Sequence, residues 1–230
     1  VYKGRKSSFP LRPLRLGALA FWSPFLQKTV VLVEYLTKDK YMNILVLNCG
    51  SSSVKFQLIH MHDESVLAKG IVEEIGQSQS KFAYQIGSKS QKEENVSIDN
   101  HENALEKIID LLLNTETGVI QHKSEIHAIG HRVVHGGSQF KSSVRIDENV
   151  KQGIRDCIPL SPLHNPPNLT GIEVAETLLP GISQVAVFDT SFGTSLPVAA
   201  HTYAIPQAWR ETYDIRRYGF HGTSHTFVAR

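Results

Sequence analysis

Residues 43 to 58 read Asn-Ile-Leu-Val-Leu-Asn-Cys-Gly-Ser-Ser-Ser-Val-Lys-Phe-Gln-Leu, and this stretch decides the fold. It opens with a compact apolar run at 43–47, continues with turn residues at 49–53, and ends with apolar and polar residues in alternation at 54–58. A short apolar run and a strict alternation are both typical of strands, and glycine followed by serines is typical of the turn between them. The stretch therefore predicts two antiparallel strands joined by a tight turn.

The chain then continues the sheet before it alternates strands with helices. We expect further strands at 66–75, 81–86 and 125–134, and a short buried strand at 183–188. We expect helices after Asp99 or Asn100, over 147–158, and from Pro166-Pro167 onward, the first with Leu105, Ile108, Ile109 and Leu112 on one face. Strands followed by alternating strands and helices predict an α/β fold with a mixed sheet and helices on its faces.

Composition narrows the class of protein. A chain of 230 residues with 41% apolar residues can bury a proper core. The formal net charge is +2, but residues 1–41 hold eight Lys or Arg and two acidic residues, which leaves −4 for residues 42–230. The body of the chain is mildly acidic, so we expect no nucleic-acid partner.

Residues 1–41 do not read as a domain. They begin at Val1, show no sustained periodicity, and contain no convincing small-residue cleavage site, although they are rich in arginine and poor in acids. We interpret them as a leader translated from upstream of the true start, with Met42 as the first residue. The uncharged run at 16–27 is too short to span a bilayer, so no membrane association is expected.

The two cysteines, Cys49 and Cys157, have neither CxxC nor Cys/His ligand spacing. A disulfide framework is not indicated, and this fits the reducing environment of the cytoplasm.

Two segments near strand ends have the residue types that bind anions. In the turn at 48–55, backbone N–H groups and hydroxyls can face a phosphate, with Lys55 as a compact positive charge, although a serine-rich turn is also common on a solvated surface. Arg132 ends an apolar strand beside Gly136-Gly137, and arginine is suited to paired hydrogen bonds with a carboxylate or phosphate. A surface arginine at a strand edge is the plain alternative.

Three further segments contain polar side chains that could bind an anion, a metal ion or a phosphoryl group. The loop at 161–168 is stiffened by prolines and can hold His164 against an anion, or can simply connect two elements. Asp189 directly follows an apolar strand, where a carboxylate can orient a nucleophile or hold Mg²⁺. His221 and His225 are four residues apart, and a histidine at a helix start suits contact with a transferring phosphoryl group.

Five motifs, NCGSSSVKFQL, GHRVVHGG, PLHNPPN, VFDT and YGFHGTSH, occur in this order over residues 42–230. In this order they resemble the acetate kinase family. The resemblance implies the fold that acetate and sugar kinases share with actin and Hsp70, two ribonuclease-H-like domains with the nucleotide between them. We therefore expect a leader at 1–41, an amino-terminal ribonuclease-H-like domain at 42–192, and the start of a truncated second domain at 193–230.

The resemblance also implies a reaction and its site. The expected activity is reversible phosphoryl transfer between ATP and acetate, which gives acetyl phosphate and ADP with Mg²⁺ as cofactor, by a protein that is a homodimer when full length. The residues implied are Asn48 for Mg²⁺; Ser51, Ser53 and Lys55 for phosphate; Arg132 for the acceptor carboxylate; Val134, Leu163 and Phe220 for its methyl group; Asp189 as the catalytic acidic residue; and His164 and His221 for the phosphoryl oxygens.

Two departures from the family pattern accompany this resemblance. Gly193 occupies a position where the family usually has histidine, and we expect altered local packing without loss of mechanism. The chain ends at Arg230, ahead of the adenosine-binding loops, a second active-site arginine and a metal-binding glutamate. We therefore expect the polypeptide alone to be inactive or nearly so, and to expose apolar surface.

Three alternatives remain open on the sequence. A propionate or butyrate kinase of the same superfamily is the nearest. A zinc hydrolase would use His131, His135, His221 and His225, although the HExxH pattern is missing. A noncatalytic nucleotide-binding module would bind ATP without making an acyl phosphate.

Overall fold

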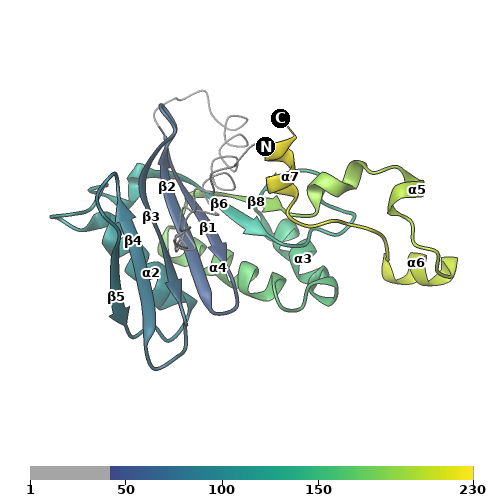
Figure 1. Cartoon of the computed structure of the whole chain (residues 1–230), viewed down its shortest axis with the longest axis horizontal. Coiled ribbons are helices and arrows are strands. Elements are labelled where there is room, and N and C mark those ends of the chain that lie inside the picture. The colour runs from purple at the N-terminus through teal and green to yellow at the C-terminus, as the bar shows by residue number, and fades with distance from the viewer. Residues whose placement is uncertain (1–41, 230) are drawn as a thin grey trace, which may run out of the picture.

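The computed structural model describes residues 42–229, and an eight-stranded mixed sheet lies at the centre of this part of the chain (Figure 1). In spatial order the sheet runs β5-β4-β3-β2-β1-β6-β8-β7. The strands are β1 (Asn43–Cys49), β2 (Ser53–His60), β3 (Ser65–Glu73), β4 (Ser80–Ile86), β5 (Lys92–Val96), β6 (Ile126–Val133), β7 (Val144–Arg145) and β8 (Ser183–Phe188). The interpretation of 1–41 as a leader concerns residues outside this described range.

The opening hairpin forms as predicted. Strands β1 and β2 pair in antiparallel register, with Asn48 opposite Lys55, and Gly50 N donates to Ser53 O at 2.7 Å to close the turn. Strands β3, β4 and β5 extend the antiparallel meander, whereas β6 and β8 run parallel to β1. The mixed sheet expected from the order of elements is confirmed.

Three longer helices cover one face of the sheet (Figure 1): α2 (His101–Leu113), α3 (Glu148–Asp156) and α4 (Asn165–Leu178). The side chain of Asn100 caps α2 by accepting from Asn103 N at 2.9 Å, and that of Asp147 caps α3. These short polar side chains satisfy backbone donors that the first turn of a helix leaves without partners. All three predicted helices are confirmed.

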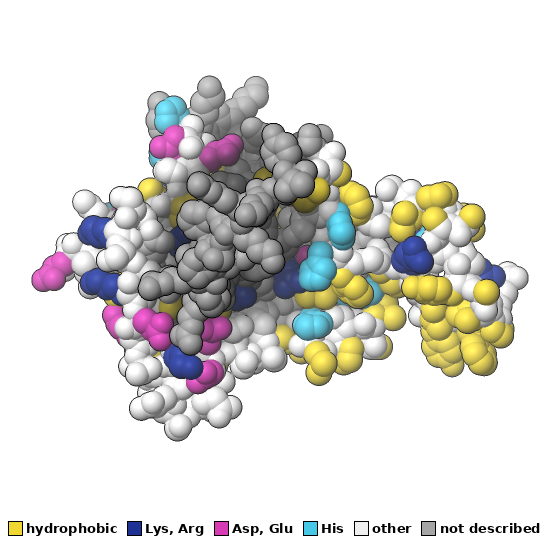
Figure 2. Space-filling view, in the orientation of Figure 1, with side chains coloured by type: hydrophobic (Ala, Val, Ile, Leu, Met, Phe, Trp, Pro, Cys, Tyr) yellow, Lys and Arg dark blue, Asp and Glu magenta, His cyan; other side chains and the backbone are white. Residues whose placement is uncertain are grey.

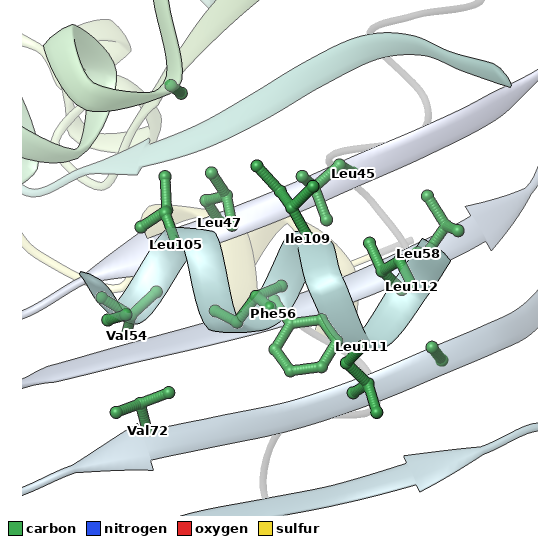
Figure 3. Packing of buried hydrophobic residues seen from close by; sticks show 14 of the residues in the cluster. Leu45, Leu47, Val54, Phe56, Leu58, Val72, Leu105, Ile109, Leu111 and Leu112 are labelled. Carbon is green, nitrogen blue, oxygen red and sulfur yellow. The ribbon is translucent and has the colours of Figure 1, made fainter. Parts of the chain in front are cut away.

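The main core lies between α2 and the antiparallel strands. Figure 3 shows Leu105, Ile109 and Leu112 of α2 pointing toward β1 and β2, where Leu47 and Phe56 are among the fully buried partners. The spacing of the apolar residues on α2 matches the period of a helix, and the alternation on β2 matches that of a strand. The apolar face of the helix therefore packs against the apolar face of the sheet.

Beyond β8 the chain leaves the sheet, projects to one side at α5 and α6, and returns beside β8 at α7 (Figure 1). This segment contains the short helices α5 (Val198–His201), α6 (Gln207–Tyr213) and α7 (Gly222–Val228), and the 3-10 helix η4 (Ser191–Ser195). Two shorter 3-10 helices, η2 (Lys123–Glu125) and η3 (Ile158–Leu160), precede β6 and α4. The domain boundary after residue 192 stays a prediction.

Large hydrophobic side chains are exposed in the second half of the chain. Within the described residues, the exposed ones all lie between Leu160 and Val228, and Trp209 and Tyr213 on α6 are more than half exposed. This agrees with the expected apolar surface. No helix in 42–229 is long and apolar enough to cross a membrane.

Candidate active site

Two neighbouring parallel strands, β6 and β8, bring a guanidinium and a carboxylate to one edge of the sheet. Arg132 lies in register with Val187, so Asp189 follows just beyond it. Nε and Nη2 of Arg132 donate to Asp189 Oδ2 at 3.0 and 2.5 Å. The Asp189 side chain has no exposed area and that of Arg132 keeps 22%. The arginine is therefore the member of the ion pair that faces solvent.

The other carboxylate oxygen of Asp189 is buried without a hydrogen-bond partner among the described residues. A buried acceptor that lacks a partner costs free energy, and such atoms are uncommon in native structures. Asp189 Oδ1 is therefore a place where a bound ion, ligand or water would be stabilised.

The end of β1 lies at the same edge. Because β1 runs parallel to β6 as its direct neighbour, Asn48 lies close to Arg132 and is buried. Burial lowers the pKa of Lys55; the charge of Glu73 opposes this shift and that of Arg132 adds to it. Since Lys55 senses Arg132 electrostatically, the hairpin and the ion pair belong to one electrostatic environment.

Two asparagines of α4 form hydrogen bonds with the backbone at this edge of the sheet. The side chain of Asn168 accepts from Val134 N at 2.9 Å and donates to Cys49 O at 2.7 Å, so it links the ends of β6 and β1. The side chain of Asn165 accepts from His135 N at 3.1 Å and donates to His135 O at 3.0 Å. Both side chains are buried, so these bonds are shielded from water.

The start of α7 is held against the Asp189 backbone. Gly222 N donates to Asp189 O at 2.8 Å, and a β-carbon at Gly222 would overlap that carbonyl oxygen. The residue before it, His221, has a φ of +57°, which turns the chain into the helix. The close approach that glycine permits therefore brings His221 to the same pocket as Asp189.

These elements enclose an open pocket of about 410 Å³. Figure 2 shows histidine side chains interspersed with hydrophobic ones on this face, to the right of the centre of the view. The outer wall is apolar, with Leu163 74% and Phe220 46% exposed. The pocket is lined by Arg132, Val134, Leu160, Ser161, Pro162, Leu163, His164, Asp189, Phe220 and His221. The pocket thus combines a partly buried ion pair, two exposed histidines and an apolar rim.

Comparison with known proteins gives the family. The sequence pattern of the acetokinase family matches residues 43–230. The chain belongs to the acetokinase family. The acetate kinase of Oleidesulfovibrio alaskensis is 52% identical over 193 residues, which cover 82% of this chain and 48% of that protein. The acetate kinase of Thermotoga maritima is 51% identical over 82% of this chain and 47% of that protein. This acetokinase-family chain therefore spans about half the length of the curated relatives it matches.

Solved structures agree on the fold of this acetokinase-family chain. The acetate kinase of Porphyromonas gingivalis superposes with a TM-score of 0.77 at 44% identity, over 80% of this chain and 46% of that one. A propionate kinase of Francisella tularensis gives 0.75 at 40% identity, over 81% and 47%. The actin-like α/β fold expected from the motifs is thus confirmed.

The structure brings most of the predicted site residues together. The pocket includes seven of them, Arg132, Val134, Leu163, His164, Asp189, Phe220 and His221. Asn48 and Lys55 lie at the same sheet edge but do not line the pocket, and Ser51 is exposed while Ser53 is half-buried in the turn. The loop expected around His164 is shorter than predicted, because α4 already begins at Asn165 with His164 as its N-cap residue.

The zinc interpretation is wrong for the described part of the chain. No group of three or more His, Cys, Asp or Glu side chains there is arranged to hold a metal ion. His131 is buried in the sheet and its Nε2 shares a 2.5 Å hydrogen bond with Gln184 Oε1. A histidine satisfied in the core in this way is not available as a ligand.

The asparagine links were missed from the sequence, where the loop at 161–168 was expected to hold His164 against an anion or simply to connect two elements. We predict that Asn168→Ala lowers the free energy of unfolding by about 2–4 kcal/mol, because it leaves Val134 N and Cys49 O buried without partners. Urea unfolding checks this, with Asn149→Ala on the exposed side of α3 as the matched control. Equal stability of both variants would contradict the bridging role.

The buried histidine predicts a pH dependence of stability. Burial lowers the pKa of His131 to about 4, from about 6.5 in the unfolded chain. Between these values the unfolded state binds the proton and the folded state does not, so stability falls by about 3 kcal/mol as the pH drops from 6.5 to 4. His131→Gln should reduce this slope in unfolding curves. It should not abolish the slope, because burial also lowers the pKa of His135.

Proposed function

We propose that this chain provides the acceptor-binding part of an acetate kinase, which transfers the terminal phosphoryl group of ATP reversibly to acetate and gives acetyl phosphate and ADP. The observation that carries this proposal is the Arg132–Asp189 pair at the base of a pocket with an apolar rim and two histidines. A short carboxylic acid has the matching chemistry, with one charged end and one apolar end.

The acceptor needs orientation and charge neutralisation more than it needs a base. A carboxylate is already ionised at neutral pH, so the barrier comes from bringing it against an anionic phosphoryl group. Arg132, the solvent-facing member of the ion pair, binds the acceptor carboxylate. Val134, Leu163 and Phe220 contact its methyl group from the apolar wall of the pocket.

The phosphoryl group lies between this acceptor and the hairpin. His164 and His221 both line the pocket and donate hydrogen bonds to the phosphoryl oxygens, where negative charge is spread in the transition state. Lys55, together with the hydroxyls of Ser51 and Ser53, contacts the phosphates of the nucleotide from the hairpin side. Asp189 keeps Arg132 oriented through the two hydrogen bonds to Oδ2.

The residues present fit a magnesium ion. Mg²⁺ prefers oxygen ligands and is usually held by one or two protein groups together with substrate phosphates. Asp189 Oδ1, buried and without a partner among the described residues, and the side-chain oxygen of Asn48 would hold it. When bound, the ion supplies positive charge that offsets the phosphate oxygens.

Propionate is the second candidate acceptor, because the fold matches a propionate kinase almost as well as an acetate kinase. The pocket is open at its rim, so its volume of about 410 Å³ leaves room for a third carbon.

A homodimeric, cytoplasmic protein remains a prediction from the family resemblance, and gel filtration of a full-length form checks its oligomeric state.

The test joins this chain to the carboxy-terminal half of an acetate kinase and measures acyl phosphate by trapping with hydroxylamine. We expect Mg²⁺- and ATP-dependent product with acetate, and a lower kcat/KM with propionate. A fusion that is folded and binds ATP but makes no acyl phosphate from either acid would reject the proposal and favour a noncatalytic nucleotide-binding module.

A further inference from the structure

His135 lies next to the pocket but does not line it. Its ring is buried, and its Nδ1 accepts from Gly137 N at 3.0 Å. Because Nδ1 acts as the acceptor, the ring is neutral and carries its proton on Nε2. Its backbone is fixed at both the N–H and the carbonyl by Asn165. The position of this ring is therefore set by the body of the domain.

The same ring contacts two aromatic side chains that come from beyond α6. Tyr218 lies edge-on at 4.5 Å between ring centroids, and Phe220 edge-on at 5.8 Å. Edge-to-face pairs at such distances are favourable beyond the area that they bury. Tyr218 is also anchored by its hydroxyl, which donates to Asp214 O at 2.7 Å, while Ser138 Oγ donates to Asp214 Oδ2 at 2.8 Å.

The backbone beside these contacts turns twice through the left-handed region. Gly219 has a φ of +72° and His221 one of +57°, and a histidine in that region persists only where its surroundings hold it. A β-carbon at Gly193 would overlap Tyr218 O, so glycine at this position lets η4 pack directly against the segment. That this packing differs from the rest of the family stays a prediction.

Phe220 depends on this support for its place in the pocket wall. It is 46% exposed, and His135 is the ring that meets it from the body of the domain in the described structure. Phe220 itself contacts the apolar end of an acceptor in the proposed function. A shift of Phe220 would widen the pocket at the end where a longer acid must fit.

We propose that His135 is a positioning residue, whose ring holds Tyr218 and Phe220 and so sets the length of carboxylic acid that the pocket accepts. This inference rests on the proposed function, because it assigns the pocket to a short acid.

The ring and the Nδ1 acceptor can be separated by two substitutions. His135→Asn keeps an acceptor for Gly137 N–H and loses the aromatic ring, whereas His135→Phe keeps a ring and loses the acceptor. Tyr218→Leu removes the partner ring from the other side of the contact. If His135 acts through its ring, the Asn and Leu variants share one phenotype and the Phe variant resembles the original chain.

The experiment titrates the 230-residue chain itself with acetate, propionate and butyrate, followed by NMR. We expect the chain to prefer acetate, and His135→Asn and Tyr218→Leu each to weaken acetate binding by about 3- to 10-fold and to remove most of the preference over butyrate. The double variant should lose little more than either single one. An unchanged preference in His135→Asn, or equal losses in His135→Asn and His135→Phe, would overturn the inference.

A second readout does not depend on ligand binding. Ring protons of Phe220 and the amide of His221 should shift in His135→Asn and stay close to their original values in His135→Phe. If no acid binds even to the unaltered chain, the assignment of a carboxylic acid to this pocket fails. The chemical shifts still decide whether His135 positions the segment that carries Tyr218 and Phe220. Unmoved resonances in His135→Asn would refute the positioning role.

Discussion

Replacing Arg132 with Ala in the fusion with the carboxy-terminal half of an acetate kinase is expected to raise the KM for acetate by about 100-fold and to reduce turnover. The guanidinium is the solvent-facing member of a pair whose carboxylate is buried, so in the proposed function it provides the positive charge that meets an acceptor carboxylate. Loss of one partner of a charge-assisted, partly buried interaction typically costs a few kcal/mol, and 1.4 kcal/mol corresponds to a factor of ten. Initial rates at varied acetate concentration measure the change.

Arg155→Ala is the matched control for this variant. Arg155 also forms an ion pair, with Glu173 at 2.6 Å, but it lies away from the pocket and is more exposed. We expect its acetate KM to stay within twofold of the original. An unchanged KM in Arg132→Ala would remove Arg132 from the acceptor site. A parallel urea titration is needed because Asp189 stays buried without its partner in that variant.

Replacing Asp189 with Asn is expected to lower turnover by about 10²- to 10³-fold while acetate binding changes less. The amide has nearly the same shape as the carboxylate, but it lacks the negative charge that orients Arg132 and that would attract a magnesium ion. Because Asp189 is buried, the substitution also lowers the free energy of unfolding, by about 1–2 kcal/mol, since Arg132 loses its ionic partner. The loss stays at this size because 22% of the Arg132 side chain is still exposed to water.

Turnover at saturating ATP, Mg²⁺ and acetate measures the effect of Asp189→Asn. Asp110→Asn on the exposed side of α2 controls for the chemical change itself and should behave like the original protein. Turnover of Asp189→Asn within threefold of the original would reject the role of the carboxylate.

The parts of the fold that could be predicted are those where local sequence and burial agree. The hairpin at 43–58, the helix capped by Asn100 and the strand that ends before Asp189 all combine an apolar period with a turn or capping residue. Strand β5 was missed because its sequence is mostly charged, and β7 because two residues carry no period. Helices α5 and α6 are too short to show one.

The sequence predicted the residue types of the candidate site, but not the contacts that hold those residues in place. Arg132 and Asp189 follow apolar strands, and their proximity results from parallel pairing of β6 with β8. Nothing local indicates that Asn168 reaches two strands, because an asparagine near prolines equally suits a cap. The positive φ of His221 is also invisible in the sequence, since few residues other than glycine adopt it and no local pattern marks which ones do.

The double link made by Asn168 has a mechanical consequence. Because one amide joins the end of β1 to the residue that follows β6, sliding the β1–β2 hairpin relative to the guanidinium would break two shielded hydrogen bonds at once. Any closing movement around the reactants would therefore displace this whole edge as a rigid body. In the proposed function this rigidity would keep the acceptor carboxylate at Arg132 and the phosphate-facing hairpin at a fixed separation.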